Sequence, residues 1–281
     1  MTETLSLRAK IEQSPMGAYQ WMIVVMAAIM NLLDGFDVLA LAFTATAIRG
    51  EFGLTGIELG YLLSAGLFGM TAGSLFLAPL ADKIGRRPLL LMAVSLSAIG
   101  MLGSAFISQY QWLGFWRVIT GLGVGGILVG TNVITSEYSS RKWRSFAISV
   151  YAAGFGIGAV LGGMFAVMLQ GEYGWRSVFL AGAILTGLLL VVLFIWLPES
   201  IDFLTSKQPK NAEVRLNLIA KKIGLAGDWK LPTKVKKVKS KLPISQLFSE
   251  KYLHSTLLIW TAFFAIMFSF YFISSWTPAL L

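Results

Sequence analysis

The sequence has no cysteine among its 281 residues and a single histidine, His254. Disulfides, thiolate metal sites and cysteine nucleophiles are therefore excluded, and a histidine-rich zinc site cannot form within one chain. Charged residues are also scarce, at 13% of the chain, whereas a soluble domain has about 25%. Because 56% of the residues are hydrophobic, the composition argues against an ordinary soluble enzyme. We expect no metal and no cofactor.

Long apolar runs dominate what is present. A membrane-spanning helix needs about 20 apolar residues. Seven runs reach this length, which predicts an all-α membrane protein with spans near 21–48, 57–80, 88–108, 112–136, 145–170, 175–197 and 252–276. The first twenty residues are polar and the first run is too long for a signal-peptide core, so no cleaved signal is expected.

The net charge of +9 reflects membrane topology more than a partner of opposite charge. Of the 23 basic residues, 20 lie on one predicted side of the membrane, Arg49 and Arg176 lie on the other, and Arg117 lies inside a span. The positive-inside rule then places the N-terminus in the cytoplasm of a multi-pass protein, which we assign to a bacterial inner membrane. This distribution gives no reason to expect nucleic-acid binding.

The runs divide the chain into four predicted parts: a cytoplasmic N-terminus (1–20), a six-helix bundle (21–197), a basic cytoplasmic linker (198–251) and a seventh span (252–281). Within the linker, Asn211 is a favourable helix N-cap and Gly224 can end the helix. A short amphipathic helix is expected there on the cytoplasmic surface, with Leu216, Ile219 and Ile223 on one face. The alternative is a solvated basic linker near anionic lipid.

Gly121, Gly123 and Gly126 match the GxGxxG pattern of dinucleotide sites. The pattern lies inside an apolar run of membrane length, and not between a strand and a helix, so we interpret it as a helix-packing surface. The same interpretation applies to two further sets of glycines, Gly66, Gly69 and Gly73 in the second span and Gly154, Gly158 and Gly162 in the fifth.

Three ionisable residues lie well inside predicted spans: Asp34, Asp37 and Arg117. Each costs about 2.5–3.5 kcal/mol at the bilayer centre on insertion scales, which points to a function. Asp34 and Asp37 are one helical turn apart, and two carboxylates this close do not readily ionise together in a low dielectric. This is the arrangement of a proton carrier. The alternative is a structural ion pair of Asp37 with Arg117, which lies at a similar predicted depth.

The turn after the second span runs from Gly73 through Asp82, Gly85, Arg86 and Arg87. With its intervening Pro79, Leu80 and Ala81, it resembles the signature loop of the major facilitator superfamily. Further pieces agree in order, namely Arg117 with Gly121, Glu137 with Arg144, Gly174-Trp175-Arg176 and Pro198-Glu199-Ser200. The resemblance implies a gating role for Gly73, Asp82, Gly85, Arg86, Arg87, Glu137 and Arg144, with Arg86 and Arg87 pairing with Glu137 or Glu199. It also implies a twelve-span fold in two bundles, so most of a C-terminal half needed for a complete site is expected to be missing.

Asp34-Gly35-Phe36-Asp37 resembles the DGxD motif of the aromatic acid:proton symporters within that superfamily. The resemblance implies alternating-access import of a small organic anion with protons. Arg117 would bind its carboxylate, and Phe264, Phe268 and Tyr271, on one face of the seventh span, would stack on its ring. Ordinary packing or lipid contact is the alternative for these aromatic residues. Other possible functions are a sugar or sugar-acid symporter, a non-transporting fragment and, least favoured, an intramembrane aspartyl protease.

Overall fold

The computed structural model describes residues 6–225, 227–231 and 248–280, and the elements in these ranges are α-helices. Parts of the predicted N-terminus and linker, residues 1–5 and 232–247, lie outside the described residues. Seven of the described helices are long and apolar enough to span a membrane, and the seven predicted spans fall on them: α2 (Ala18–Phe52), α3 (Gly56–Ile84), α4 (Arg86–Ala105), α5 (Tyr110–Tyr138), α6 (Arg144–Tyr173), α7 (Trp175–Trp196) and α10 (Glu250–Leu280). The predicted all-α membrane fold is confirmed.

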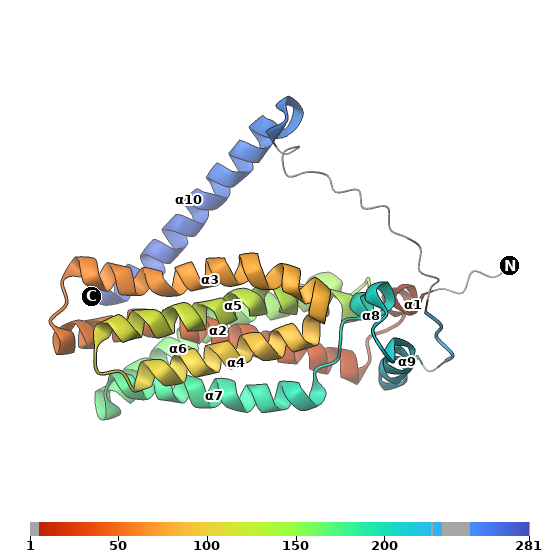
Figure 1. The fold of residues 1–281 in the computed structure, drawn as a ribbon, viewed down its shortest axis with the longest axis horizontal. Helices are drawn as coiled ribbons and strands as arrows, with labels where there is room; N and C mark the ends of the chain where they lie inside the picture. Colours follow the sequence, from red (N-terminus) through yellow and green to blue (C-terminus); the bar gives the residue numbers. More distant parts are fainter. Residues whose placement is uncertain (1–5, 226, 232–247, 281) are drawn as a thin grey trace. The chain divides into compact units, whose positions relative to one another are not determined.

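The chain divides into two compact units, residues 1–231 and 232–281. The first contains the bundle α2–α7, drawn from red-brown to green-blue in Figure 1. Within it, α3 packs along α5, α2 along α6, and α4 against both α5 and α7. The second unit contains α10, on which Phe264 and Phe268 stack with ring centroids 5.9 Å apart, while Phe270 contacts Tyr271 edge to face.

Glycines allow α3 to approach α5 closely and α2 to approach α6 closely. A methyl group added at Gly121 of α5 would overlap the backbone carbonyl of Gly66 on α3, and one added at Gly158 of α6 would overlap the carbonyl of Leu32 on α2. Contacts this close require residues without a side chain. The packing interpretation of Gly121 and Gly158 is therefore confirmed, and Gly121 lies within α5 and not at a strand-to-helix turn.

Three short helices gather at one end of the bundle: α1 (Leu7–Gln13), α8 (Ile201–Lys207) and α9 (Ala212–Lys222) (Figure 1). This is the predicted cytoplasmic end, where α2 begins. Leu216 and Ile219 of α9 are buried in one apolar cluster with Leu7 and Ile11 of α1 and with Leu204 of α8. The apolar face of α9 therefore packs against protein.

Asn211 is the N-cap residue of α9, as predicted, but its side chain does not cap the helix. Its backbone has φ 63° and its side chain makes no capping hydrogen bond. An N-cap residue normally has an extended backbone that aims its side chain at the first amides of the helix, and the left-handed conformation of Asn211 removes that geometry. Gly224 has φ 80° and follows the end of the helix, where a left-handed glycine is favourable.

Candidate functional site

The buried ion pair of Asp37 and Arg117 lies within the bundle. Arg117 Nη1 donates to Asp37 Oδ1 at 2.7 Å, and Nη2 donates to the Asp37 carbonyl oxygen at 2.7 Å. Asp37 is 2% exposed and Arg117 3%. One guanidinium thus holds both the carboxylate and the backbone of α2. A buried pair of this kind is costly to break from one side, because a charge remains without a partner.

Three further residues surround the pair, two from α4 and one from α7. Ser97 of α4 donates from Oγ to Asp37 Oδ2 at 2.9 Å, and Met101 Sδ lies 3.5 Å from Arg117 Nη1. The Phe179 ring of α7 lies 5.8 Å from Arg117 Cζ. The sequence analysis missed all three, because neither a lone serine nor an apolar residue in a span shows which neighbouring helix it faces.

Asp34 lies one turn before Asp37 but in different surroundings. It is 2% exposed, and its Oδ2 atom has no hydrogen-bond partner among the described residues. Arg117 forms its ion pair with Asp37. The two carboxylates therefore differ: Asp37 has a cationic partner and a hydroxyl donor, whereas Asp34 has a buried oxygen that no group in the described part of the chain satisfies.

Arg117 does not reach the surface of the bundle in this conformation. Its guanidinium is enclosed among α2, α4, α5 and α7, and no group that the structure describes forms a hydrogen bond with its Nε atom. The predicted contact of Arg117 with a substrate carboxylate therefore requires a rearrangement that opens the site. Phe264, Phe268 and Tyr271 belong to the second unit, and their contact with substrate stays a prediction.

The signature loop is organised by Glu199. The backbone amides of Arg86 and Arg87 donate to Glu199 Oε1 at 2.8 and 3.1 Å. Gly85 has φ 106°, and a methyl group there would overlap the Glu199 carboxylate, so the turn needs glycine for both reasons. Arg86 itself pairs with Asp82 at 2.7 Å. The predicted pairing of Glu199 with the two arginines thus occurs through their backbone amides.

Gly73 and Arg87 lie in contacts that the resemblance did not specify. A methyl group at Gly73 of α3 would overlap the carbonyl of Leu122 on α5, which makes Gly73 a helix-packing residue in this structure. Arg87 Nη2 donates to the carbonyl of Phe194 on α7 at 2.6 Å. The Arg87 guanidinium thus contacts α7, and its predicted pairing with Glu137 is not formed among the described residues.

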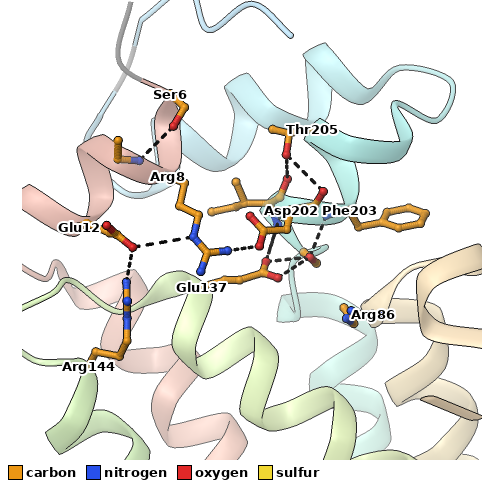
Figure 2. A network of polar contacts seen from close by, with 12 residues as sticks. Ser6, Arg8, Glu12, Arg86, Glu137, Arg144, Asp202, Phe203 and Thr205 are labelled. Atoms are coloured by element: carbon orange, nitrogen blue, oxygen red, sulfur yellow. Dashed lines mark hydrogen bonds and ion pairs between the residues drawn. The ribbon is translucent and has the colours of Figure 1, made fainter. Parts of the chain in front are cut away.

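Glu137 and Arg144 hold the short helices to the bundle, as Figure 2 shows. Glu137 is 3% exposed and caps α8: it accepts from Ser200 Oγ at 2.7 Å and from the Ile201 amide at 2.8 Å. A carboxylate at a helix N-terminus is favoured by the unpaired amides there. The expected pairing of Glu137 with Arg86 or Arg87 is replaced by this cap.

Helix α1 contacts both α6 and α8 through charged side chains. Arg144 Nη2 donates to Glu12 Oε1 at 2.6 Å, and Arg8 pairs with Asp202 of α8 (Figure 2). The Arg141 amide also donates to the Glu12 carbonyl at 3.0 Å. The hydrogen bond from Arg144 holds the pKa of Glu12 below its ordinary value. We name Arg8, Glu12, Arg144 and Asp202 the α1 clasp.

The Major Facilitator Superfamily profile matches residues 27–281. The chain belongs to this superfamily. A gallate transporter of Pseudomonas putida is 34% identical over 271 residues, which cover 96% of this chain and 60% of that protein. The 4-hydroxybenzoate transporter PcaK of the same species is 33% identical over 282 residues, covering 99% of this chain and 63% of PcaK.

A solved structure shows the same fold. The xylose transporter XylE from E. coli, in a partially occluded inward-open conformation, matches with a TM-score of 0.64 at 22% identity, over 72% of this chain and 55% of that one.

The chain spans about 60% of the length of the gallate transporter and of PcaK. These relatives are transporters and not enzymes, which removes the protease alternative.

Proposed function

We propose that this chain supplies the N-terminal bundle of a proton-coupled symporter that imports a small aromatic carboxylate. The single observation that carries the proposal is the buried Asp37–Arg117 pair, with the carboxylate of Asp34 one turn away. Gallate and 4-hydroxybenzoate, which name the two relatives, are both aromatic carboxylates. The alternative of a sugar symporter is supported by the similarity to the xylose transporter XylE, but at 22% identity this similarity shows only a shared fold.

Coupling follows from the charge on Asp37. When Asp37 is ionised, it holds Arg117 through two hydrogen bonds. Protonation removes the negative charge and frees the guanidinium for a substrate carboxylate, which forms strong charge-assisted bonds in a low dielectric. Asp34 places a second carboxylate nearby, whose negative charge favours proton binding at the site. Alternating access would then carry proton and anion across together.

The membrane placement is part of the same proposal. Seven apolar helices and the one-sided distribution of basic residues support a multi-pass protein of the bacterial inner membrane with a cytoplasmic N-terminus. Arg117 and the aromatic residues Phe264, Phe268 and Tyr271 would contact the substrate. The signature loop, with Asp82 at its exposed edge, would act in gating at the cytoplasmic side.

The test is uptake of labelled 4-hydroxybenzoate by membrane vesicles that contain this chain within a complete two-bundle transporter. Asp37→Asn is expected to abolish accumulation driven by an inward proton gradient, while exchange of substrate across the membrane continues. Asp228→Asn changes the same group at a site that is 78% exposed, and serves as the matched control. Normal accumulation by Asp37→Asn would reject the coupling role of Asp37.

A further inference from the structure

A second group of polar side chains lies buried where α2, α5 and α6 meet, apart from the ion pair. Three of its atoms have no hydrogen-bond partner within the described ranges: Asn31 Oδ1, Asp34 Oδ2 and Thr135 Oγ1. Their residues are 4%, 2% and 0% exposed. An unsatisfied buried polar atom costs about 1–3 kcal/mol. Internal water usually satisfies such atoms, provided that several polar groups surround it.

Tyr151 of α6 interacts with Asn31 and Asp34 of α2 and with Thr131 of α5. Its hydroxyl contacts Thr131 of α5 and lies close enough to Asp34 to interact with its charge. Its backbone carbonyl accepts from Asn31 Nδ2 at 2.9 Å. Asn31 and Asp34 are one turn apart on α2, and Thr131 and Thr135 are one turn apart on α5, so each pair shares a helix face. We name these five residues the polar strip.

The polar strip runs toward one end of the bundle. Asn31 lies on the side of Asp34 where α2 begins, and Thr135 lies three residues before α5 ends at Tyr138. This is the predicted cytoplasmic end. In the opposite direction, Asp34 is followed by Asp37, which is held by Arg117. The ionisable groups that face Asp34 are thus Asp37 from its own helix and Tyr151 from α6, with Arg117 of α5 bound on Asp37.

Packing alone does not explain the polar strip. Valine has nearly the shape of threonine, and phenylalanine that of tyrosine, so an apolar version could fill the same space without unsatisfied oxygens. Hydroxyl groups differ from these side chains in one relevant respect, since each can accept one proton and donate another. A chain of such groups with water between them supports proton transfer.

We propose that the polar strip holds internal water and conducts the proton between Asp34 and the cytoplasmic end of the bundle. The inference rests on the proposed function, with Asp34 as a second proton-binding carboxylate beside Asp37, and it gives the proton of Asp34 a route. In the release direction, the O–H bond of the Asp34 carboxylic acid breaks and the proton passes to the adjacent water. Each water or hydroxyl then gives its own proton onward, and a hydronium ion leaves at the cytoplasmic end. No electron is transferred.

Infrared spectroscopy of the purified 281-residue chain in lipid nanodiscs tests this inference without requiring transport. The carbonyl stretch of a protonated Asp34 is identified as the band that Asp34→Asn removes. The sample is then moved from H₂O into D₂O, and the rate at which this band shifts reports how fast the carboxyl proton exchanges. Tyr151→Phe and Thr135→Val are each expected to slow exchange by about tenfold, equivalent to about 1.4 kcal/mol of barrier.

Matched controls separate conduction from general damage. Tyr173→Phe lies at the other end of α6 at a side chain that is 71% exposed, and Thr71→Val lies at an exposed position on α3. Both are expected to exchange at the original rate. Thr135→Ser keeps the hydroxyl and should restore fast exchange. Tryptophan fluorescence on heating checks that each variant is folded. If Thr135→Val does not fold, the exchange rate of Tyr151→Phe decides the result.

The outcomes distinguish the two proposals. An Asp34 band that exchanges equally fast in Tyr151→Phe, Thr135→Val and the controls overturns the polar strip as a route and leaves the coupling role of Asp37 intact. The absence of any band removed by Asp34→Asn, across the pH range in which the chain is folded, overturns both the route and the proton-carrying role of Asp34. Slower exchange confined to the polar-strip variants supports the inference.

Discussion

Neutralising one member of the Asp37–Arg117 pair should destabilise the bundle strongly, while neutralising both should not. Asp37→Asn leaves Arg117 charged, 3% exposed and without an anionic partner. Removing one partner from a buried pair costs about 3–5 kcal/mol, whereas replacing both charges is often nearly neutral. Asp37→Asn combined with Arg117→Met should therefore recover most of the stability that Asp37→Asn loses.

The matched control is Glu51→Gln, which makes the same chemical change in an exposed pair. Glu51 Oε1 accepts from Arg176 Nη2 at 2.7 Å, the length found for Asp37 and Arg117, but these side chains are about 40% exposed. An exposed pair contributes about 0.2–1 kcal/mol. The free energy of unfolding in mixed micelles, followed through tryptophan fluorescence, compares the variants directly.

Two results would refute this reasoning. If Asp37→Asn costs no more than Glu51→Gln, then the pair is hydrated or open in solution. If the double variant remains as unstable as Asp37→Asn, then the loss does not come from an unpaired charge. The double variant also separates stability from coupling, because a stable protein without these charges should show no proton-driven accumulation in the complete transporter. Concentration of substrate by that variant would leave the pair a structural role only.

Three further predictions concern the predicted cytoplasmic end. Arg8→Asp should increase hydrogen exchange in α1 and α8, and adding Asp202→Arg should restore protection, because the swap rebuilds the pair; a double variant as exposed as the single one would contradict this. Arg144 lowers the pKa of the Glu12 carboxylate in the folded protein below its value of 4.5 in the unfolded chain. The ionised carboxylate therefore contributes its full stability above pH 4.5, and this contribution is lost as the pH falls through the lower pKa of the folded state. Protection of α1 should thus be constant from about pH 6 to 8 and fall only below about pH 4.5; a loss near neutral pH would assign it to another group. In the complete transporter, Asp82→Asn should slow turnover and leave the substrate Kd nearly unchanged; a large loss of equilibrium binding with normal turnover would reject a gating role.

The sequence predicts those residues of the site whose placement in a membrane has a high free-energy cost. Asp37 and Arg117 stand out because a charged residue inside an apolar span needs compensation, and their similar predicted depth indicates that they pair. Ser97 gives no comparable signal, since one hydroxyl can satisfy itself on its own helix. Its role depends on α4 facing α2 at that level, which is a property of the packed bundle.

The short helices show a different limit. A helix of seven residues, such as α1 or α8, has fewer than two full turns, so its apolar period cannot be distinguished from chance. Leu7 and Ile11 are four residues apart and both buried, but this spacing is also common in loops. The pattern in α9 is longer and indicates a helix, although it does not show that the apolar face packs against α1 and α8 instead of lipid.

The distribution of exposed charge at the predicted cytoplasmic end indicates which of the predicted gating residues is available to contact a second bundle. Glu137 is buried as the cap of α8, Glu199 is bound to the amides of the signature loop, and Arg144 is held by Glu12. These groups fix α1 and α8 to the six-helix bundle, so they would move with it. The Asp82 side chain, by contrast, is 65% exposed and, within the described part of the chain, pairs with Arg86 four residues later. We therefore expect Asp82 to exchange partners during a conformational cycle, while the other residues of the signature pattern build the surface on which it is presented.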